Sequence, residues 1–216
     1  NAAPVGFAPA TQAIYGVWDW NMTAWNSKSS IQYAALSAAG SGLTAPNYTL
    51  GTANLQKQTF TLNSDGVTRD ITGTSTICWA GSSGCTSTPQ FGWYLKMIGT
   101  LEQIIYNPQL LQGVFTVNSI VPANNQVTSC TINTDTGFTY AISVLSGTAP
   151  PHFFVGFHDA AAAGTQTGAV GMSFPVTSST GSLWLVSQTV TNQPILTQVN
   201  PGANGKGRRL TWVQLR

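Results

Sequence analysis

Short runs of aromatic and β-branched residues, each closed by Gly, Asn, Ser or Pro, recur along this chain and leave little room for any architecture other than β-sheets. Such runs are typical of strands, and the residues that close them are typical of turns. Helical periodicity is scarce, and only Ile31–Gly42 could form a short helix before its glycines end it. The expected strands are Gln12–Trp20, Lys57–Asn63, Gly66–Gly73, Gly113–Pro122, Gly137–Gly147, Gly181–Val190 and Arg209–Leu215. The sequence therefore predicts an all-β fold of antiparallel sheets, either a sandwich or a propeller.

One pair of these strands carries a clear hairpin signal. Asn63-Ser64-Asp65-Gly66 joins two alternating runs and has the residue types that favour a tight turn. The same stretch offers oxygen ligands on Asn63, Asp65 and Asp70, but they are too few and wrongly spaced for a calcium loop. We therefore expect a hairpin here and no calcium site.

The composition is unusual for a folded chain because only 6% of the residues are charged, against about a quarter in ordinary soluble domains. Ser, Thr, Asn, Gln and Gly must therefore form much of the surface, which suits extracellular and filament-associated proteins. A net charge of +2 gives little reason to expect nucleic acid as a partner. No apolar run approaches the roughly 18 to 20 residues that span a bilayer. The first ten residues do not resemble an export signal, which we expect to be upstream or removed.

Candidate catalytic residues are few. Glu102 is the only glutamate, and the five aspartates show no spacing that singles out a catalytic pair. His152 and His158 flank an aromatic run, with Asp159 next to the second, so a metal or acid–base role is conceivable. We favour the interpretation that they are loop histidines beside a buried strand. The common motifs of hydrolases, metalloproteases and nucleotide-binding enzymes are absent, and the sequence favours a non-enzymatic protein.

Three cysteines allow one disulfide with one residue left over. Cys78 and Cys85 are separated by a stretch whose Gly-Ser-Ser-Gly can bend the chain back on itself. A disulfide between them is favoured over metal ligation, because no second C-x-x-C or H-x-x-x-H motif accompanies them. Cys130 would then be either buried or paired with a segment outside this chain.

Three separated segments together resemble the C-terminal domain of the PilY family of type IV pilus proteins. The first is "TQAIYGVWD" at the start of the chain, and the third is "GRRLTWVQLR" at its end. The second runs from "GWYLKM" through "EQIIYNPQLLQGVFTVNSIVP" and a cysteine to "TGFTYAISVLSG". Order and approximate spacing agree with the family. Gln103 and Ile104 replace an Arg-Val of the family, and Ser143 stands where it tends to have Asp, which indicates a divergent member.

The resemblance implies a modified β-propeller, exported and carried at the tip of the pilus on a platform of minor pilins. There it would promote pilus assembly and support adhesion to a host or abiotic surface. The family's aspartate-rich calcium loop is not found in this chain, so no cofactor is assigned. A propeller blade takes about 40 to 45 residues, so residues 1–216 are expected to form a single all-β domain that supplies the last part of a longer protein's propeller.

The end of the chain concentrates half of its eight cations in eleven residues. Alternation in "RLTWVQL" places Leu210 and Trp212 on a buried face, while Arg208 and Arg209 lie at the start of the strand. We therefore expect a terminal strand that completes a blade or pairs with a neighbouring sheet, its arginines bonding carbonyls or a carboxylate.

Two other function classes fit parts of the sequence. "TYAISVLSG" also resembles the repeats of quinoprotein propeller enzymes, although the repeat is not sustained and no cofactor-clamping Cys-Cys pair is present. A carbohydrate-binding β-sandwich would use exposed tryptophans such as Trp20 or Trp25 as sugar platforms. Tryptophans in a β-rich chain belong to the core more often than to a ligand site.

Overall fold

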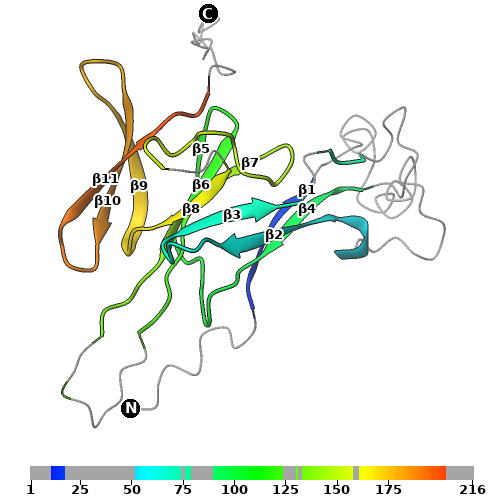
Figure 1. The fold of residues 1–216 in the computed structure, drawn as a ribbon, viewed down its shortest axis with the longest axis horizontal. Coiled ribbons are helices and arrows are strands. Elements are labelled where there is room, and N and C mark those ends of the chain that lie inside the picture. The colour runs from blue at the N-terminus through cyan, green and yellow to red at the C-terminus, as the bar shows by residue number, and fades with distance from the viewer. Residues whose placement is uncertain are drawn as a thin grey trace, which may run out of the picture.

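Strands dominate the computed structural model, which describes residues 11–17, 52–73, 76–78, 90–123, 130, 133–157 and 161–202 (Figure 1). In these residues the strands are β1 (Ala13–Val17), β2 (Gln56–Leu62), β3 (Thr68–Thr72), β4 (Gly92–Lys96), β5 (Gln109–Leu111), β6 (Val114–Asn118), β7 (Phe138–Ser143), β8 (Ala162–Gln166), β9 (Ala169–Thr177), β10 (Leu183–Thr189) and β11 (Pro194–Val199). A single 3-10 turn, η2 (Thr52–Asn54), precedes β2. The prediction of an all-β chain is confirmed for this part of the molecule. No helix in it is long and apolar enough to cross a membrane.

The larger sheet has eight strands in the order β1-β4-β2-β3-β8-β7-β6-β5. All its neighbours are antiparallel except β2 and β4, which run parallel. The expectation of purely antiparallel sheets is therefore wrong at this one place. After the β2–β3 hairpin the chain crosses to the other side of β2, and a crossover of this kind brings in a parallel strand.

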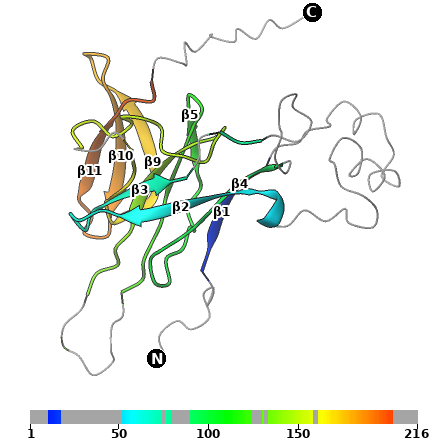
Figure 2. The same ribbon diagram turned by 45° about the vertical axis from the view of Figure 1, so that its right-hand side comes forward.

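The smaller sheet has the order β11-β10-β9 and is antiparallel throughout. It lies beside the β5–β8 end of the larger sheet, with β9 in contact with β6, and away from β1 and β4, as both views show (Figures 1 and 2). Pro175 lies in β9, at the edge of this sheet, where a missing N–H interrupts no ladder.

Alternation along β7 divides the core into two clusters. Phe138, Tyr140 and Ile142 join a first cluster with side chains of β1–β4, among them Trp93 and Leu95. Ala141 points the other way and packs in a second cluster with residues of both sheets and of the segment between β7 and β8: Val114, Phe153, Phe154, Ala162, Leu185 and Val199. β7 is thus buried on both faces, and the second cluster holds the smaller sheet against the larger one.

The predicted hairpin is confirmed, because β2 and β3 pair antiparallel around Asn63–Gly66. Gly66 adopts a φ of 71°, a conformation that glycine tolerates best. The Asp65 carboxylate accepts hydrogen bonds from the Val67 and Thr68 amides, each at 2.9 Å, and from the Thr68 hydroxyl. These bonds lower the pKa of Asp65, with the Thr68 hydroxyl contributing most. Asp65 therefore stabilises the turn.

Candidate functional site

Glu102 lies in the loop between β4 and β5, where its side chain is buried and accepts four hydrogen bonds. Its Oε1 accepts from the hydroxyls of Ser119 and Tyr140, each at 2.6 Å. Its Oε2 accepts from the Arg69 guanidinium at 2.6 Å and from the Gly99 amide at 3.0 Å. Both members of the ion pair are almost fully buried. We call Arg69, Glu102, Ser119 and Tyr140 the ionic cluster.

Arg69 reaches the cluster because it shares the inward face of β3 with Ile71. Its guanidinium carbon lies 3.5 Å from the centroid of the Phe138 ring, and the guanidinium also bonds the Tyr140 hydroxyl. The attraction between the cation and the aromatic face offsets part of the cost of removing the charge from water. Gly164 of β8 is the register partner of both Arg69 and Tyr140. A Cβ at Gly164 would lie 2.7 Å from the Tyr140 ring, so the cluster requires glycine there.

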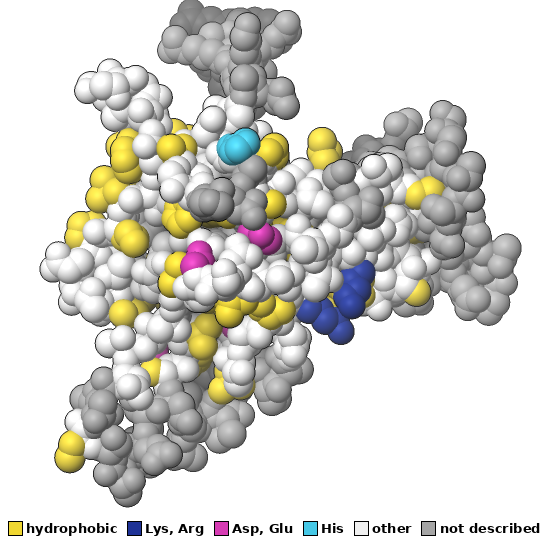
Figure 3. Space-filling view, viewed as in Figure 1, with side chains coloured by type: hydrophobic (Ala, Val, Ile, Leu, Met, Phe, Trp, Pro, Cys, Tyr) yellow, Lys and Arg dark blue, Asp and Glu magenta, His cyan; other side chains and the backbone are white. Residues whose placement is uncertain are grey.

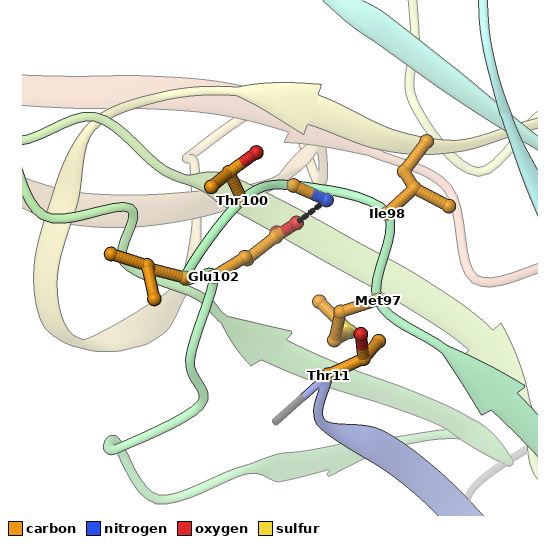
Figure 4. A pocket seen from close by; sticks show the side chains of 7 residues that line it. Thr11, Met97, Ile98, Thr100 and Glu102 are labelled. Carbon is orange, nitrogen blue, oxygen red and sulfur yellow. Dashed lines mark hydrogen bonds between the residues drawn. The ribbon is translucent and has the colours of Figure 1, made fainter. Parts of the chain in front are cut away.

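The ionic cluster borders a shallow, mostly polar cavity of about 300 Å³, lined by Thr11 and residues 97–102. Figure 4 shows the Gly99–Glu102 hydrogen bond that closes this loop. Each carboxylate oxygen of Glu102 already accepts two hydrogen bonds, so neither is directed at the cavity as a free base or metal ligand. Burial, followed by the nearby Glu102 charge, raises the pKa of Tyr140 well above its ordinary value, and the phenol stays neutral. The cluster therefore has a structural role, because its hydrogen bonds join β3, β7 and the loop 97–102.

The smaller sheet presents an apolar surface on the side that faces away from the core. The register places Val186 of β10 directly between Phe174 of β9 and Leu196 of β11. Trp184 occupies the next row with Val176. Phe174 is 58% exposed and Leu196 is 56% exposed. A hollow of about 490 Å³ beside this row is lined mainly by Val170, Met172, Phe174, Val186 and Pro194. We call this surface the β9–β11 outer face, and Figure 3 shows hydrophobic side chains gathered on that side of the molecule.

Single exposed apolar residues such as Leu110 occur elsewhere in the described chain, but in this row three apolar side chains lie side by side across three strands. Monomeric proteins rarely expose contiguous apolar patches unless another surface covers them. The β9–β11 outer face is therefore the candidate interaction surface of the described chain.

The residues that the sequence singled out as sites fall largely outside the described ranges. Arg208, Arg209, Leu210 and Trp212 of the expected terminal strand lie outside them, as does Cys85. Cys78 is disulfide-bonded in the structure, but the pairing with Cys85 stays a prediction because Cys85 is not described.

Other candidate residues can be placed in part. Cys130 is free and exposed, so of its two expected states the buried one is wrong, while pairing with a segment outside this chain stays a prediction. His152 lies exposed in a turn with a φ of 55°, while His158, Asp159, Trp20 and Trp25 lie outside the described ranges. Within the described residues no three His, Cys, Asp or Glu side chains gather as a metal site would require. The assignment of no cofactor stays a prediction.

Sequence reasoning named Glu102 but assigned it no role. Two features of the sequence could have indicated the ion pair. Glu102 is the only glutamate, and Arg69 shares a strand face with Ile71. An arginine at an inward position needs a buried acceptor, and Glu102 was the only glutamate available.

Comparison with known proteins supports the predicted fold. A solved structure, the crystal structure of the Pseudomonas aeruginosa PilY1 C-terminal domain, aligns with 89% of this chain at 22% sequence identity and a TM-score of 0.56. The chain has the fold of that domain. It spans 37% of the PilY1 chain, little more than a third. The predicted resemblance to part of a PilY-type propeller is thus confirmed for the fold. No protein-family model matches the sequence, and no curated protein does so significantly.

Proposed function

We propose that this chain belongs to an extracellular, non-enzymatic type IV pilus tip protein that docks on minor pilins and promotes pilus biogenesis and surface adhesion. The observation that carries the proposal is the shared fold with the PilY1 C-terminal domain across 89% of the chain. The three sequence segments that resemble the family support it independently, since they occur in the family's order.

The β9–β11 outer face is the surface we assign to the contact with a minor pilin. It is apolar and continuous across three strands, as the row of Phe174, Val186 and Leu196 shows. Association through such a row would bury aromatic and aliphatic side chains at the centre of an interface, where most binding energy is concentrated. The ionic cluster supports the non-enzymatic assignment, because the hydrogen bonds of Glu102 are already saturated within the protein.

A pull-down of purified minor pilins by the chain tests the proposal, together with a deletion strain scored for surface pili. We expect binding and a loss of surface pili. Phe174→Asp should weaken the pull-down at least about tenfold while leaving the melting temperature nearly unchanged, because the side chain is exposed. Leu110→Asp, at an exposed apolar position on β5, is the matched control and should bind normally.

Normal piliation in the deletion strain combined with no pilin binding would overturn the proposal. If Phe174→Asp lowered the melting temperature and left binding intact, the outer face would instead serve a contact within the folded protein.

A further inference from the structure

We propose that the outer face of β1, β4 and β2 binds an acidic polysaccharide. This inference deepens the adhesion part of the proposed function, and its biological meaning rests on that function. The binding itself is a property of the isolated chain and can be measured without a pilus.

The register of three strands defines this face. Tyr15 of β1 pairs with Tyr94 of β4, which in turn pairs with Lys57 of β2. The next row contains Lys96 of β4 beside Thr59 of β2. Since paired residues share a face of a sheet, these five side chains lie together. Their neighbours along the strands, Ile14, Leu95 and Gln58, point into the buried interior.

The two lysines form a small positive patch that has no ion-pair partner among the described residues. Lys57 and Lys96 are diagonal neighbours, with Cβ atoms about 8 Å apart by the geometry of neighbouring strands. Both are exposed, and neither takes part in the single ion pair found among the described residues, Arg69–Glu102. Figure 3 shows one dark blue patch, with the visible acidic side chains apart from it. In a protein with so few charges, this patch favours a ligand that carries regularly spaced anions.

Among the described residues, Asp70 is the acidic residue closest to this face in the register, and it forms no ion pair with either lysine. It pairs with Thr61, one row beyond Lys96 and Thr59, and lies on β3. Its carboxylate accepts a hydrogen bond from the Asn63 side chain at 2.8 Å. The lysines therefore keep their charge available for a ligand.

The tyrosines explain why a sugar polymer fits better than a generic polyanion. The rings of Tyr15 and Tyr94 stack at 6.2 Å between centroids and 21° between planes, and Tyr15 is 54% exposed. Tyrosine combines an apolar ring with a hydroxyl, so it can pack against a sugar ring and bond its hydroxyl groups. Thr59 and Thr72 are exposed in the next row, beside Lys96, where the Thr72 hydroxyl donates to the Thr59 carbonyl. A flat face of hydroxyls and stacked rings beside two ammonium groups matches a chain of uronic acid units.

β1 and β4, which carry most of this face, lie on the other side of the drawn strands from β9–β11 in both views (Figures 1 and 2). A minor pilin bound on one side would therefore leave the other side open to a ligand. The two surfaces also differ in chemistry, apolar in one case and cationic with aromatic rings in the other.

The test uses the 216-residue chain and oligogalacturonate, with the fully methyl-esterified oligomer as a control of the same backbone without charge. Calorimetry at low salt should show binding to the acid form, weakened as ionic strength rises, and little binding to the ester. Lys57→Gln and Lys96→Gln should each lower affinity about threefold, and Tyr15→Ala about fivefold. The Lys57→Arg/Lys96→Arg variant keeps the charge and should keep the binding.

Absence of binding, equal binding of acid and ester, or affinity that is unchanged in the double glutamine variant would overturn the inference. A single-stranded DNA of equal charge that bound as tightly would show a general polyanion surface and overturn the assignment to sugars. The double glutamine variant should still capture the minor pilin. Loss of glycan binding alone thus bears on this inference, and loss of pilin capture by the unaltered chain bears on the proposed function.

Discussion

Two polar clusters are buried in this protein, and they use opposite chemistry. The ionic cluster, built on Arg69 and Glu102, lies within the larger sheet and its loop 97–102. The second cluster is neutral: Asn118 of β6 donates to the Gly171 carbonyl and the Ser173 hydroxyl, each at 2.9 Å. Thr139 donates to Asn118, and Ser173 bonds Ser187. The neutral cluster therefore crosses from the larger sheet to the smaller one.

The difference shows how each cluster limits the fold. A buried charge is very costly without its partner, so the ionic cluster selects the arrangement in which β3, β7 and the loop around Glu102 meet. Hydroxyl and amide groups are less costly and can bond in more than one geometry. The ionic cluster should therefore stabilise the arrangement of strands within the larger sheet, while the neutral cluster should stabilise the contact between the two sheets by a smaller free energy.

The largest expected effect comes from removing one charge of the ion pair. Glu102→Gln leaves the Arg69 guanidinium buried without a counter-charge and should lower the free energy of unfolding by about 3–5 kcal/mol. The double variant Arg69→Met/Glu102→Gln should be more stable than Glu102→Gln alone, because no buried charge remains. Urea unfolding of the two single variants and the double variant measures this coupling. If Glu102→Gln and Arg69→Met each lowered the free energy of unfolding by less than about 1 kcal/mol, the structural role of the ion pair would be contradicted.

An intermediate effect is expected at the link between the sheets. Asn118→Leu leaves the Gly171 carbonyl, Ser173 and Thr139 short of partners and should cost about 1–3 kcal/mol. Hydrogen exchange should accelerate more in β9 and β10 than in β7, because the link holds the smaller sheet. Ser187→Ala removes only the outermost hydroxyl and is the control, with a smaller cost of about 1 kcal/mol. Equal acceleration in all strands would show that the two sheets unfold as one unit.

Local sequence patterns predicted the strands that carry large side chains and end in turns. β1, β3, β6, β7 and β10 lie within the expected strands, β2 begins one residue before its expected start, and the β2–β3 hairpin follows from its turn residues. β8 was not expected, because Ala162–Gln166 lacks β-branched bulk until Thr165. Small residues are needed there, since the Tyr140 ring occupies the space above Gly164. β9 and β11 were also not among the expected strands; each contains a proline, which is tolerated because both strands lie at sheet edges.

Features formed by residues that are distant in the sequence could not be predicted from local sequence patterns. The parallel pairing of β2 with β4 depends on a crossover, and no residue of either strand encodes it alone. Arg69 and Glu102 are 33 residues apart and meet only when β3 and the loop that follows β4 come together in the folded chain. The apolar row on the β9–β11 outer face likewise appears only when three strands are in register, since each contributes one or two of its side chains.

The smallest expected effect is the pH dependence of the free energy of unfolding, which should differ between the two clusters. Because burial and Glu102 raise the pKa of Tyr140 in the folded state, its proton is held after the unfolded chain has lost its own, near pH 10. Below that pH both states keep the proton, and the contribution to stability is present in full. Above it, stability should fall by about 1.4 kcal/mol per pH unit from this residue alone, and Tyr140→Phe should lack this part of the slope.

Urea unfolding from pH 9 to 11 measures this difference. Subtracting the slope of Tyr140→Phe from that of the unaltered protein gives the contribution of Tyr140. Asn118→Leu should follow the slope of the unaltered protein, because the neutral cluster contains no group that titrates in this range. Parallel slopes for the protein and Tyr140→Phe would mean that the folded state releases the phenol proton as readily as the unfolded chain. The ionic cluster would then be open to water, and the large cost expected for Glu102→Gln would lose its physical basis.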